Sequence, residues 1–232
     1  MSPHTPITAV LIIKANSERV RGKNFRILAD RPLFRWPIDT LLSIESVERI
    51  VINTDACGHL RAAGLSSDPR IVLDTRKPAL CGDAVTANAL LADILPRFEA
   101  KSYLMTHATS PFLTAASISA ARSKLANNPG YDTLHSVNRF QTRFDGADGR
   151  PINHDPSKLL PTQLLETWYE ENSALYLFSA ESFAATGSRI GLRPLRFATP
   201  RWESVDIDDE DDWLLADLVA KGLTGTRGKT AS

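Results

Sequence analysis

The sequence has few cysteines, no excess of charge of either sign and no long apolar run. Its two cysteines, Cys57 and Cys81, lack metal-ligand spacing and indicate buried thiols rather than a disulfide, with no zinc or redox role. Because 27 basic residues balance 27 acidic ones, no global field attracts nucleic acid or an anionic membrane, and any anion site must be local. The early apolar run, residues 9–13, is too short to span a bilayer, and no leader pattern precedes it. We therefore expect a cytoplasmic protein with no membrane or nucleic-acid partner.

The length of 232 residues, 43% of them hydrophobic, predicts one domain with a sizeable core. No linker rich in Pro, Gly or Ser divides the chain. We expect a single domain over residues 1–221. A disordered tail is expected over 222–232, where Gly, Thr, Lys and Arg replace the apolar periodicity.

Short apolar strands alternate with helical stretches along the chain. The expected strands are 9–13, 49–53, 70–73, 103–106, 133–137, 174–178 and 194–197, and the expected helices are 33–43, 57–64, 84–98, 115–126, 180–185 and 209–221. This alternation predicts an α/β fold with a mainly parallel sheet and helices on both faces. The polar stretch 138–172 is long for a loop, and we expect an insertion that carries acceptor-binding residues or a dimer contact.

A late acidic run is the most informative motif. In an extended segment, Asp206 and Asp208 share one face while Val205 and Ile207 turn toward packing. Two such carboxylates can hold one Mg²⁺, which leaves its other positions to water and substrate phosphates. The pattern predicts phosphoryl or nucleotidyl transfer. The alternative is an acidic first turn of the helix expected from residue 209, where acids complement the helix dipole.

A basic loop follows the first expected strand, at the edge of a parallel sheet where ligands bind. Its cationic and hydrogen-bonding side chains are Lys14, Asn16, Ser17, Arg19, Arg21, Lys23 and Asn24. Such a loop can supply the cations and donors that a triphosphate requires, although a solvated basic loop is the alternative. It is not a Walker A loop, because the Gly-x4-Gly-Lys-Ser/Thr spacing is absent.

Polar residues also follow the fourth expected strand and precede a helix. Thr109 and Ser110 are expected either to cap the next helix or to contact a base or sugar, and Asp83 is a candidate N-cap of the helix from residue 84. His107 is a lone histidine at a strand end. It either donates to a ligand or is a satisfied core histidine.

Several short segments occur in a set order. They are Asn16-Ser17 with Lys23-Asn24, Pro32-Leu33, Asn53-Thr54-Asp55, Thr109-Ser110-Pro111, Glu171-Asn172-Ser173-Ala174-Leu175-Tyr176 and Ser204-Val205-Asp206-Ile207-Asp208. In this order and spacing they resemble the acylneuraminate cytidylyltransferase (CMP-sialic acid synthetase) family, over residues 9–216. The segment before Tyr176 is similar to the family's Asn-Gly-Ala-Ile-Tyr.

The resemblance implies a Rossmann-like nucleotidyltransferase, often dimeric, that joins CTP to a sugar acid and releases pyrophosphate with Mg²⁺. By position, it implies CTP contacts for Lys14, Asn16, Ser17, Arg19, Lys23, Asn24, Arg76, Thr109 and Ser110. It implies catalytic roles for Lys23, Asp206 and Asp208, the two aspartates being the metal ligands. Cytosine as the base follows from the resemblance alone.

The sequence departs from the family where the acceptor should bind. His107 stands where the family commonly has Gln, while Thr162 and Glu170 stand where the sialic acid enzymes have arginines. Loss of a bidentate carboxylate clamp changes what can be recognised. The candidate acceptor contacts are His107, Arg139, Arg143, Gln163, Tyr169 and Asn172, with a dimer contact or solvated surface as the alternative for those in the insertion.

Two functions remain open at this point. The first is a CTP-dependent transferase acting on a 2-keto sugar acid or another small acid such as a phosphonate. The second is a nucleotide-binding relative that has lost turnover. Retention of Lys23 and both aspartates favours the enzyme, because a binding protein has no need of a metal pair.

Overall fold

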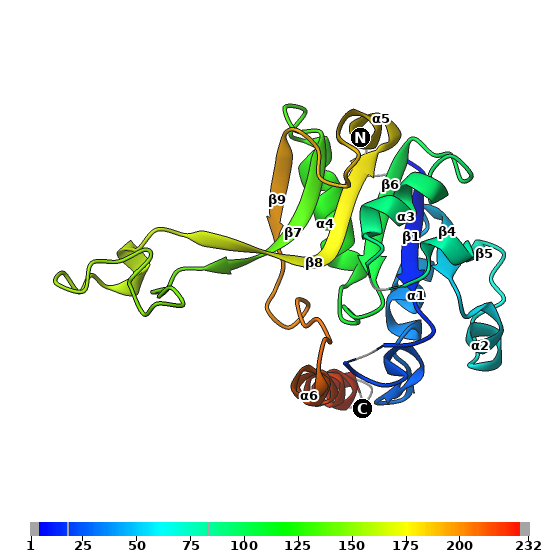
Figure 1. The fold of residues 1–232 in the computed structure, drawn as a ribbon, viewed down its shortest axis with the longest axis horizontal. Helices are drawn as coiled ribbons and strands as arrows, with labels where there is room; N and C mark the ends of the chain where they lie inside the picture. Colours follow the sequence, from blue (N-terminus) through cyan, green and yellow to red (C-terminus); the bar gives the residue numbers. More distant parts are fainter. Residues whose placement is uncertain (1–4, 18, 83, 228–232) are drawn as a thin grey trace.

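A seven-stranded sheet forms the centre of the computed structural model, which describes residues 5–17, 19–82 and 84–227. Its strand order is β5-β4-β1-β6-β8-β7-β9 (Figure 1). The strands are β1 (Ile7–Ile13), β4 (Val47–Thr54), β5 (Ile71–Thr75), β6 (Ser102–His107), β7 (Thr133–Phe140), β8 (Trp168–Ser179) and β9 (Pro194–Ala198). All run in one direction except β8, which pairs antiparallel with β6 and β7.

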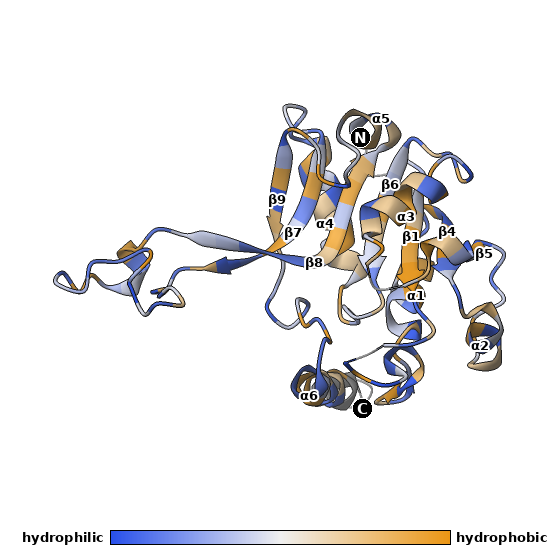
Figure 2. Ribbon diagram, viewed as in Figure 1, coloured by the Kyte–Doolittle hydropathy of each residue, from blue (hydrophilic) through white to orange (hydrophobic). Residues whose placement is uncertain are grey.

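Helices cover both faces of this sheet. They are α1 (Arg35–Leu42), α2 (Cys57–Ala62), α3 (Ala87–Ile94), α4 (Ala115–Ala126), α5 (Ala180–Thr186) and α6 (Glu210–Arg227). Because side chains alternate along a strand, Ala9 and Leu11 of β1 pack with α1, α2 and α4, whereas Val10 packs with α3 and α5. Figure 2 shows the hydrophobic residues concentrated in the central strands. The prediction of a mainly parallel α/β sheet with helices on both faces is confirmed.

The helix α6 lies across the carboxyl ends of the strands, beside the loop after β1 (Figure 1). A separate hydrophobic cluster joins Trp213 and Ala216 of α6 to Val20 and Leu28 in that loop region. Leu28 belongs to a two-stranded hairpin of β2 (Ile27–Leu28) and β3 (Arg31–Pro32), which the periodicity did not predict. This packing holds the segment before α6 against the loop after β1.

The stretch 138–172, expected to be an insertion, is an arm whose base is two-stranded. Strands β7 and β8 continue past the sheet and pair from Val137 with Glu171 to Phe140 with Trp168, and the arm projects from the body (Figure 1). The sequence indicates the insertion but not its paired strands, because the strand signal of these polar residues is weak. A role for the arm in dimerisation or acceptor binding stays a prediction.

The remaining elements agree closely with the sequence. Each of the seven expected strands and six expected helices has its counterpart, and both cysteines are free. The expected burial of the thiols was wrong, because Cys81 is exposed and Cys57 is of intermediate exposure. The last helix is longer than expected, since α6 continues through Arg227 into the predicted tail; residues 228–232 lie outside the described part of the chain. Among the described residues, none of the helices combines the length and apolar character needed to cross a bilayer.

Candidate functional site

A cavity of about 470 Å³ lies at the carboxyl ends of β1 and β6. Its walls include Lys14, Asn16, Ser17, Arg19, Lys23, Asn24, His107 and Thr109, all of them predicted site residues, together with Ile12, Ala108 and the α3-side residues Val85, Ala87 and Leu90. The expected basic loop therefore does face a cavity. The apolar wall from the α3 side was missed, because a short run of small apolar residues carries no functional signal in a sequence.

Hydrogen bonds from neighbouring elements fix the loop after β1. Oδ1 of Asp55, which follows β4, accepts from the Ala15 backbone N–H at 2.7 Å, and the Asn24 side chain donates to the Lys14 carbonyl at 2.9 Å. Gly22 adopts φ +63°, a conformation that L side chains rarely adopt. This turn leads directly into the single 3₁₀ turn η1 (Lys23–Phe25). The loop is thus held rigid from both sides.

Lys23 connects this loop to the acidic segment before α6. Its side chain is only 9% exposed, and its ammonium group donates to the Ile207 carbonyl and lies 3.6 Å from Oδ1 of Asp208. Arg19 adds a second connection, with Nη2 at 2.7 Å from the same Asp208 oxygen. The two segments on which the transferase prediction depends are therefore in direct contact.

The two aspartates lie in different environments. Asp206 accepts a hydrogen bond from the Thr109 hydroxyl, and burial raises the pKa of its carboxyl group. Its Oδ1 is buried and has no hydrogen-bond donor among the described residues. The Asp208 side chain is 44% exposed. Val205 and Ile207, which alternate with the aspartates along the chain, are buried as predicted, although the segment lies outside the sheet.

These carboxylates suit a hard divalent cation. A buried carboxylate oxygen without a donor beside an accessible second carboxylate is a fitting pair for Mg²⁺, which takes one or two carboxylates and fills its other positions with water and phosphate oxygens. In the part of the chain that is described, no cluster of three or more His, Cys, Asp or Glu side chains could hold a metal. The alternative acidic helix start is also present, since Asp209 and Asp212 cap each other's backbone N–H groups at the start of α6.

His107 is a half-buried residue that lines the cavity rather than a satisfied core histidine. Burial first, and then the positive charge of Arg189, lower the pKa of its imidazole to about 4, so the ring is neutral near pH 7. Its Nε2 is buried without a partner among the described residues. A ligand in the cavity can therefore complete its hydrogen bonding.

Two predicted nucleotide contacts lie outside the cavity. Arg76 is buried, with Nε donating to Asn53 Oδ1 at 2.8 Å and Nη2 to the Ile13 and Asn53 carbonyls at 3.2 and 3.0 Å. It ties the end of β5 to β1 and β4 and is structural. Ser110 is buried below the cavity. It does not cap α4 either, because Thr114 accepts from the Ser117 N–H there, and Asp83, the expected cap of α3, lies outside the described residues.

The predicted acceptor contacts in the insertion do not reach this cavity within one chain. Arg139 donates to Gln141 and Thr167, Arg143 donates to the Leu160 carbonyl, and Tyr169 lies beneath Arg196, all on or at the base of the arm. Gln163 is exposed and is held through its backbone carbonyl by the Gln141 side chain. Acceptor contacts from these side chains are therefore not supported within a single chain.

Asn172 is a structural residue where β8 bulges, opposite Ser136. Its Oδ1 accepts from the Ser136 hydroxyl at 2.6 Å, and its Nδ2 donates to Thr199 at 2.7 Å and to Ser204 at 3.2 Å. The side chain is buried and its polar atoms are used inside the fold. The predicted acceptor contact is therefore corrected to a link between the base of the arm and the segment that carries Asp206.

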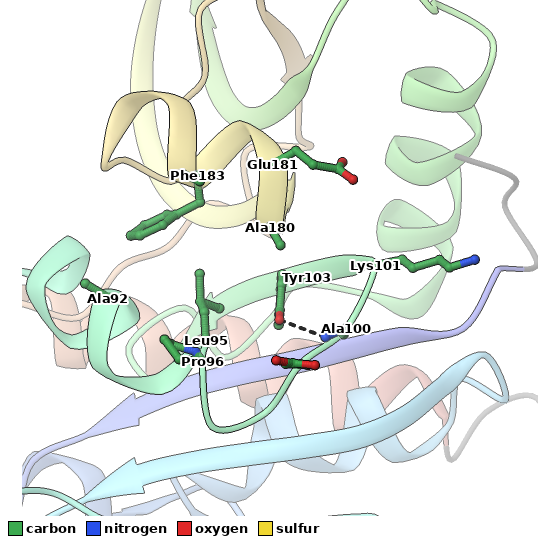
Figure 3. A pocket seen from close by; sticks show the side chains of 11 residues that line it. Ala92, Leu95, Pro96, Ala100, Lys101, Tyr103, Ala180, Glu181 and Phe183 are labelled. Atoms are coloured by element: carbon green, nitrogen blue, oxygen red, sulfur yellow. Dashed lines mark hydrogen bonds between the residues drawn. The ribbon is translucent and has the colours of Figure 1, made fainter.

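A larger cavity, about 640 Å³, lies at the opposite end of β6 (Figure 3). Its walls are mainly apolar and include Leu95, Pro96, Tyr103 and Phe183. The Tyr103 hydroxyl accepts from the Ala100 N–H at 2.8 Å there. None of the predicted site residues contributes to it. We assign the function to the smaller cavity because the cationic loop residues Lys14, Arg19 and Lys23 line that one.

Comparison with known proteins agrees with this geometry. The chain is 25% identical over 222 residues to an N-acylneuraminate cytidylyltransferase of Escherichia coli, covering 91% of this chain and 51% of that protein. It is 27% identical over 230 residues to a CMP-N,N'-diacetyllegionaminic acid synthase of Legionella pneumophila, covering 92% and 95%. The chain spans about half the length of the N-acylneuraminate cytidylyltransferases it matches.

Solved structures show the same fold at low identity. A CMP:2-keto-3-deoxy-manno-octonic acid synthetase in complex with CTP has a TM-score of 0.64 at 10% identity, covering 95% of this chain and 100% of that one. A 4-diphosphocytidyl-2C-methyl-D-erythritol synthase from Anaerococcus prevotii has a TM-score of 0.66 at 10% identity, covering 93% and 96%. The family model of cytidylyltransferases matches residues 10–197. With most of its length matched in this way, the chain belongs to the cytidylyltransferase family.

Proposed function

We propose that the chain transfers CMP from CTP to a sugar acid and releases pyrophosphate. The observation that carries this proposal is the contact between the basic loop and the acidic pair through Lys23, at the edge of a cavity. Relatives named for N-acylneuraminate and diacetyllegionaminate activation support a sugar acid as the acceptor. A small acid such as a phosphonate remains the second acceptor class, because the family's acceptor arginines are absent.

In the proposed reaction, the acceptor hydroxyl oxygen attacks the α-phosphorus in line with the bond to the leaving pyrophosphate. A P–O bond forms to the acceptor, the bond to the bridging oxygen breaks, and pyrophosphate leaves with the electron pair. Lys14, Arg19 and Lys23 neutralise phosphate charge, while Asn16 and Ser17 supply polar contacts in the same cavity. We assign uptake of the hydroxyl proton to the acidic pair.

Mg²⁺ is the proposed cofactor, and Asp206 and Asp208 are the residues that would hold it. When bound, it would supply positive charge at the phosphate oxygens. Arg19 and Asp208 form a largely exposed ion pair, at 67% and 44% side-chain exposure. Such a pair contributes about 0–1 kcal/mol to stability. Arg19 can therefore leave Asp208 and bind a phosphate group at little cost in free energy.

The direct test is pyrophosphate release with CTP, Mg²⁺ and a panel of ulosonic acids and phosphonates. We expect release with at least one ulosonic acid, and inhibition of that reaction by excess CTP analogues but not by purine triphosphates. Binding of CTP without turnover across the whole panel would instead favour a nucleotide-binding relative that has lost catalysis. A preference for another triphosphate would remove cytosine from the proposal.

We also propose that the arm assembles the chain into a homodimer. It presents exposed apolar side chains, with Leu159 at 77% and Leu164 at 66% exposure, around an aromatic group of Phe140, Phe144 and Trp168. A two-stranded ribbon is marginally stable alone, and exposed apolar patches of this kind mark interaction sites. A second copy of the arm offers a matching apolar surface.

Charged substitutions on the arm should therefore yield monomers. We expect the double variant Leu159→Asp and Leu164→Asp to sediment as a monomer at concentrations where the unaltered protein is a dimer. The control is Leu192→Asp, a residue of similar exposure, 76%, in the loop before β9 on the body of the molecule. An unaltered protein that sediments as a monomer, or a control that dissociates equally, would refute the arm as the dimer contact.

A further inference from the structure

A cluster of polar side chains lies one strand beyond the nucleotide cavity. His107 of β6 and Tyr176 of β8 lie on neighbouring strands and contact edge to face, with ring centroids 6.3 Å apart. Arg189, in the loop after α5, lies over the Tyr176 ring at 4.1 Å, and its Nη2 donates to the tyrosine hydroxyl at 3.1 Å. The cluster therefore adjoins the cavity through His107, which lines it.

Neighbouring residues hold Arg189 in place without using all of its donors. Its backbone N–H donates to Asn88 Oδ1 of α3 at 3.3 Å, and its Nη2 lies 3.7 Å from Oε1 of Glu171. Tyr176 in turn donates to Glu171. The Arg189 side chain is only 18% exposed, and its Nε is buried without an acceptor among the described residues.

Two buried nitrogens without partners among the described residues, Nε of Arg189 and Nε2 of His107, thus belong to side chains that both contact the Tyr176 ring. An unmet buried polar group costs about 1–3 kcal/mol, more when it carries charge, so such a pair favours the binding of a ligand that completes its hydrogen bonds. A guanidinium group is the side chain best suited to a planar carboxylate, which accepts hydrogen bonds and donates none.

We propose that Arg189 binds the carboxylate of the acceptor acid and that His107 forms the adjoining wall of the same subsite. The proposal rests on the proposed function, because it deepens the acceptor site of that reaction. Arg189 would then take the role of the arginines that are replaced by Thr162 and Glu170 in this sequence, although it lies in a loop that no motif indicates. The subsite lies beyond His107 from the basic loop, which places the acceptor beside the nucleotide rather than on top of it.

The test pairs a change in the protein with a change in the substrate. Arg189→Met keeps the packing over Tyr176 and removes the charge, and the methyl ester of the acceptor acid removes the carboxylate charge. Using the ulosonic acid that turns over, we expect either change alone to lower kcat/KM by about 100-fold, the loss typical of a charged hydrogen-bonded pair. Both changes together should cost little more than one, because they remove the same interaction.

Controls separate this role from a structural one. In Arg189→Met, the KM for CTP and the melting temperature should stay close to those of the unaltered protein. Arg193→Met, in the same loop with an exposed side chain, should change kcat/KM for neither the acid nor its ester. Arg189→Lys keeps the charge and should recover part of the preference for the acid over its ester.

The outcomes also distinguish the two proposals. If Arg189→Met keeps the full preference for the acid, or loses CTP affinity equally, the assignment of Arg189 is wrong while the transferase stands. If the unaltered protein transfers CMP to no acid in the panel, the proposed function and this subsite fall together.

Discussion

Replacing Lys23 by methionine should reduce turnover by about 10³-fold, the loss found when a preorganised charge at a reacting centre is removed. Lys23 is 9% exposed and its ammonium group bonds the Ile207 carbonyl beside Asp208. Methionine has a similar length and can occupy the same buried channel, so the main loss is the charge. The measurement is kcat for pyrophosphate release at saturating CTP.

The same substitution should lower stability measurably. The Ile207 carbonyl loses its donor, and an unpaired buried polar group costs about 1–3 kcal/mol. Thermal or urea unfolding measures this change. The matched control is Arg21→Met in the same loop, whose exposed side chain should leave rate and stability unchanged. A Lys23→Met protein with normal kcat would separate Lys23 from catalysis and leave it a structural link.

Replacing Asp208 by alanine should abolish Mg²⁺-dependent turnover and leave folding nearly unchanged. Its ion pair with Arg19 is largely exposed and contributes about 0–1 kcal/mol to stability. Its loss as a proposed metal ligand leaves only Asp206 of the pair, because the nearby Asp212 carboxylate accepts from the Asp208 and Asp209 N–H groups at 2.9 and 3.1 Å. The measurements are pyrophosphate release across a Mg²⁺ titration and unfolding by urea.

The control for Asp208 is Asp211→Ala, an exposed acid in the first turn of α6. This variant should keep full activity, because its loss removes local negative charge without touching the cavity. Normal Mg²⁺ dependence in Asp208→Ala would remove Asp208 from the metal site. Equal loss in both variants would point to the acidic helix start as a whole, rather than to a ligand pair.

The strands and the cavity loop could be predicted because their signals are local. The apolar run of β1 and the Lys and Arg residues after it have clear periodicity and composition, and the structure places most of that loop in one cavity. Arg76 could not be separated from a ligand-binding arginine by sequence. Its partners, Asn53 and the Ile13 carbonyl, come together only when β1, β4 and β5 pair.

Other features depend on contacts between distant segments. The arm is built from polar strands whose pairing partner is some 30 residues away, as with Asn138 and Glu170, and period-2 patterns in polar strands are weak. Arg189 belongs to no motif, and its relation to His107 arises only from the adjacency of β6 and β8. The roles of such residues depend on contacts between distant segments, which the local composition does not reveal.

The amide of Asn172 has a consequence for how assembly and chemistry relate. It bonds Ser136 and Asn138 of the arm's first strand on one side, and Ser204, two residues before Asp206, on the other. A displacement of the arm is therefore transmitted through one side chain to the segment that carries the proposed cation ligands. In a dimer held by the arm, the contact between subunits would influence the position of Asp206 and Asp208 in each subunit.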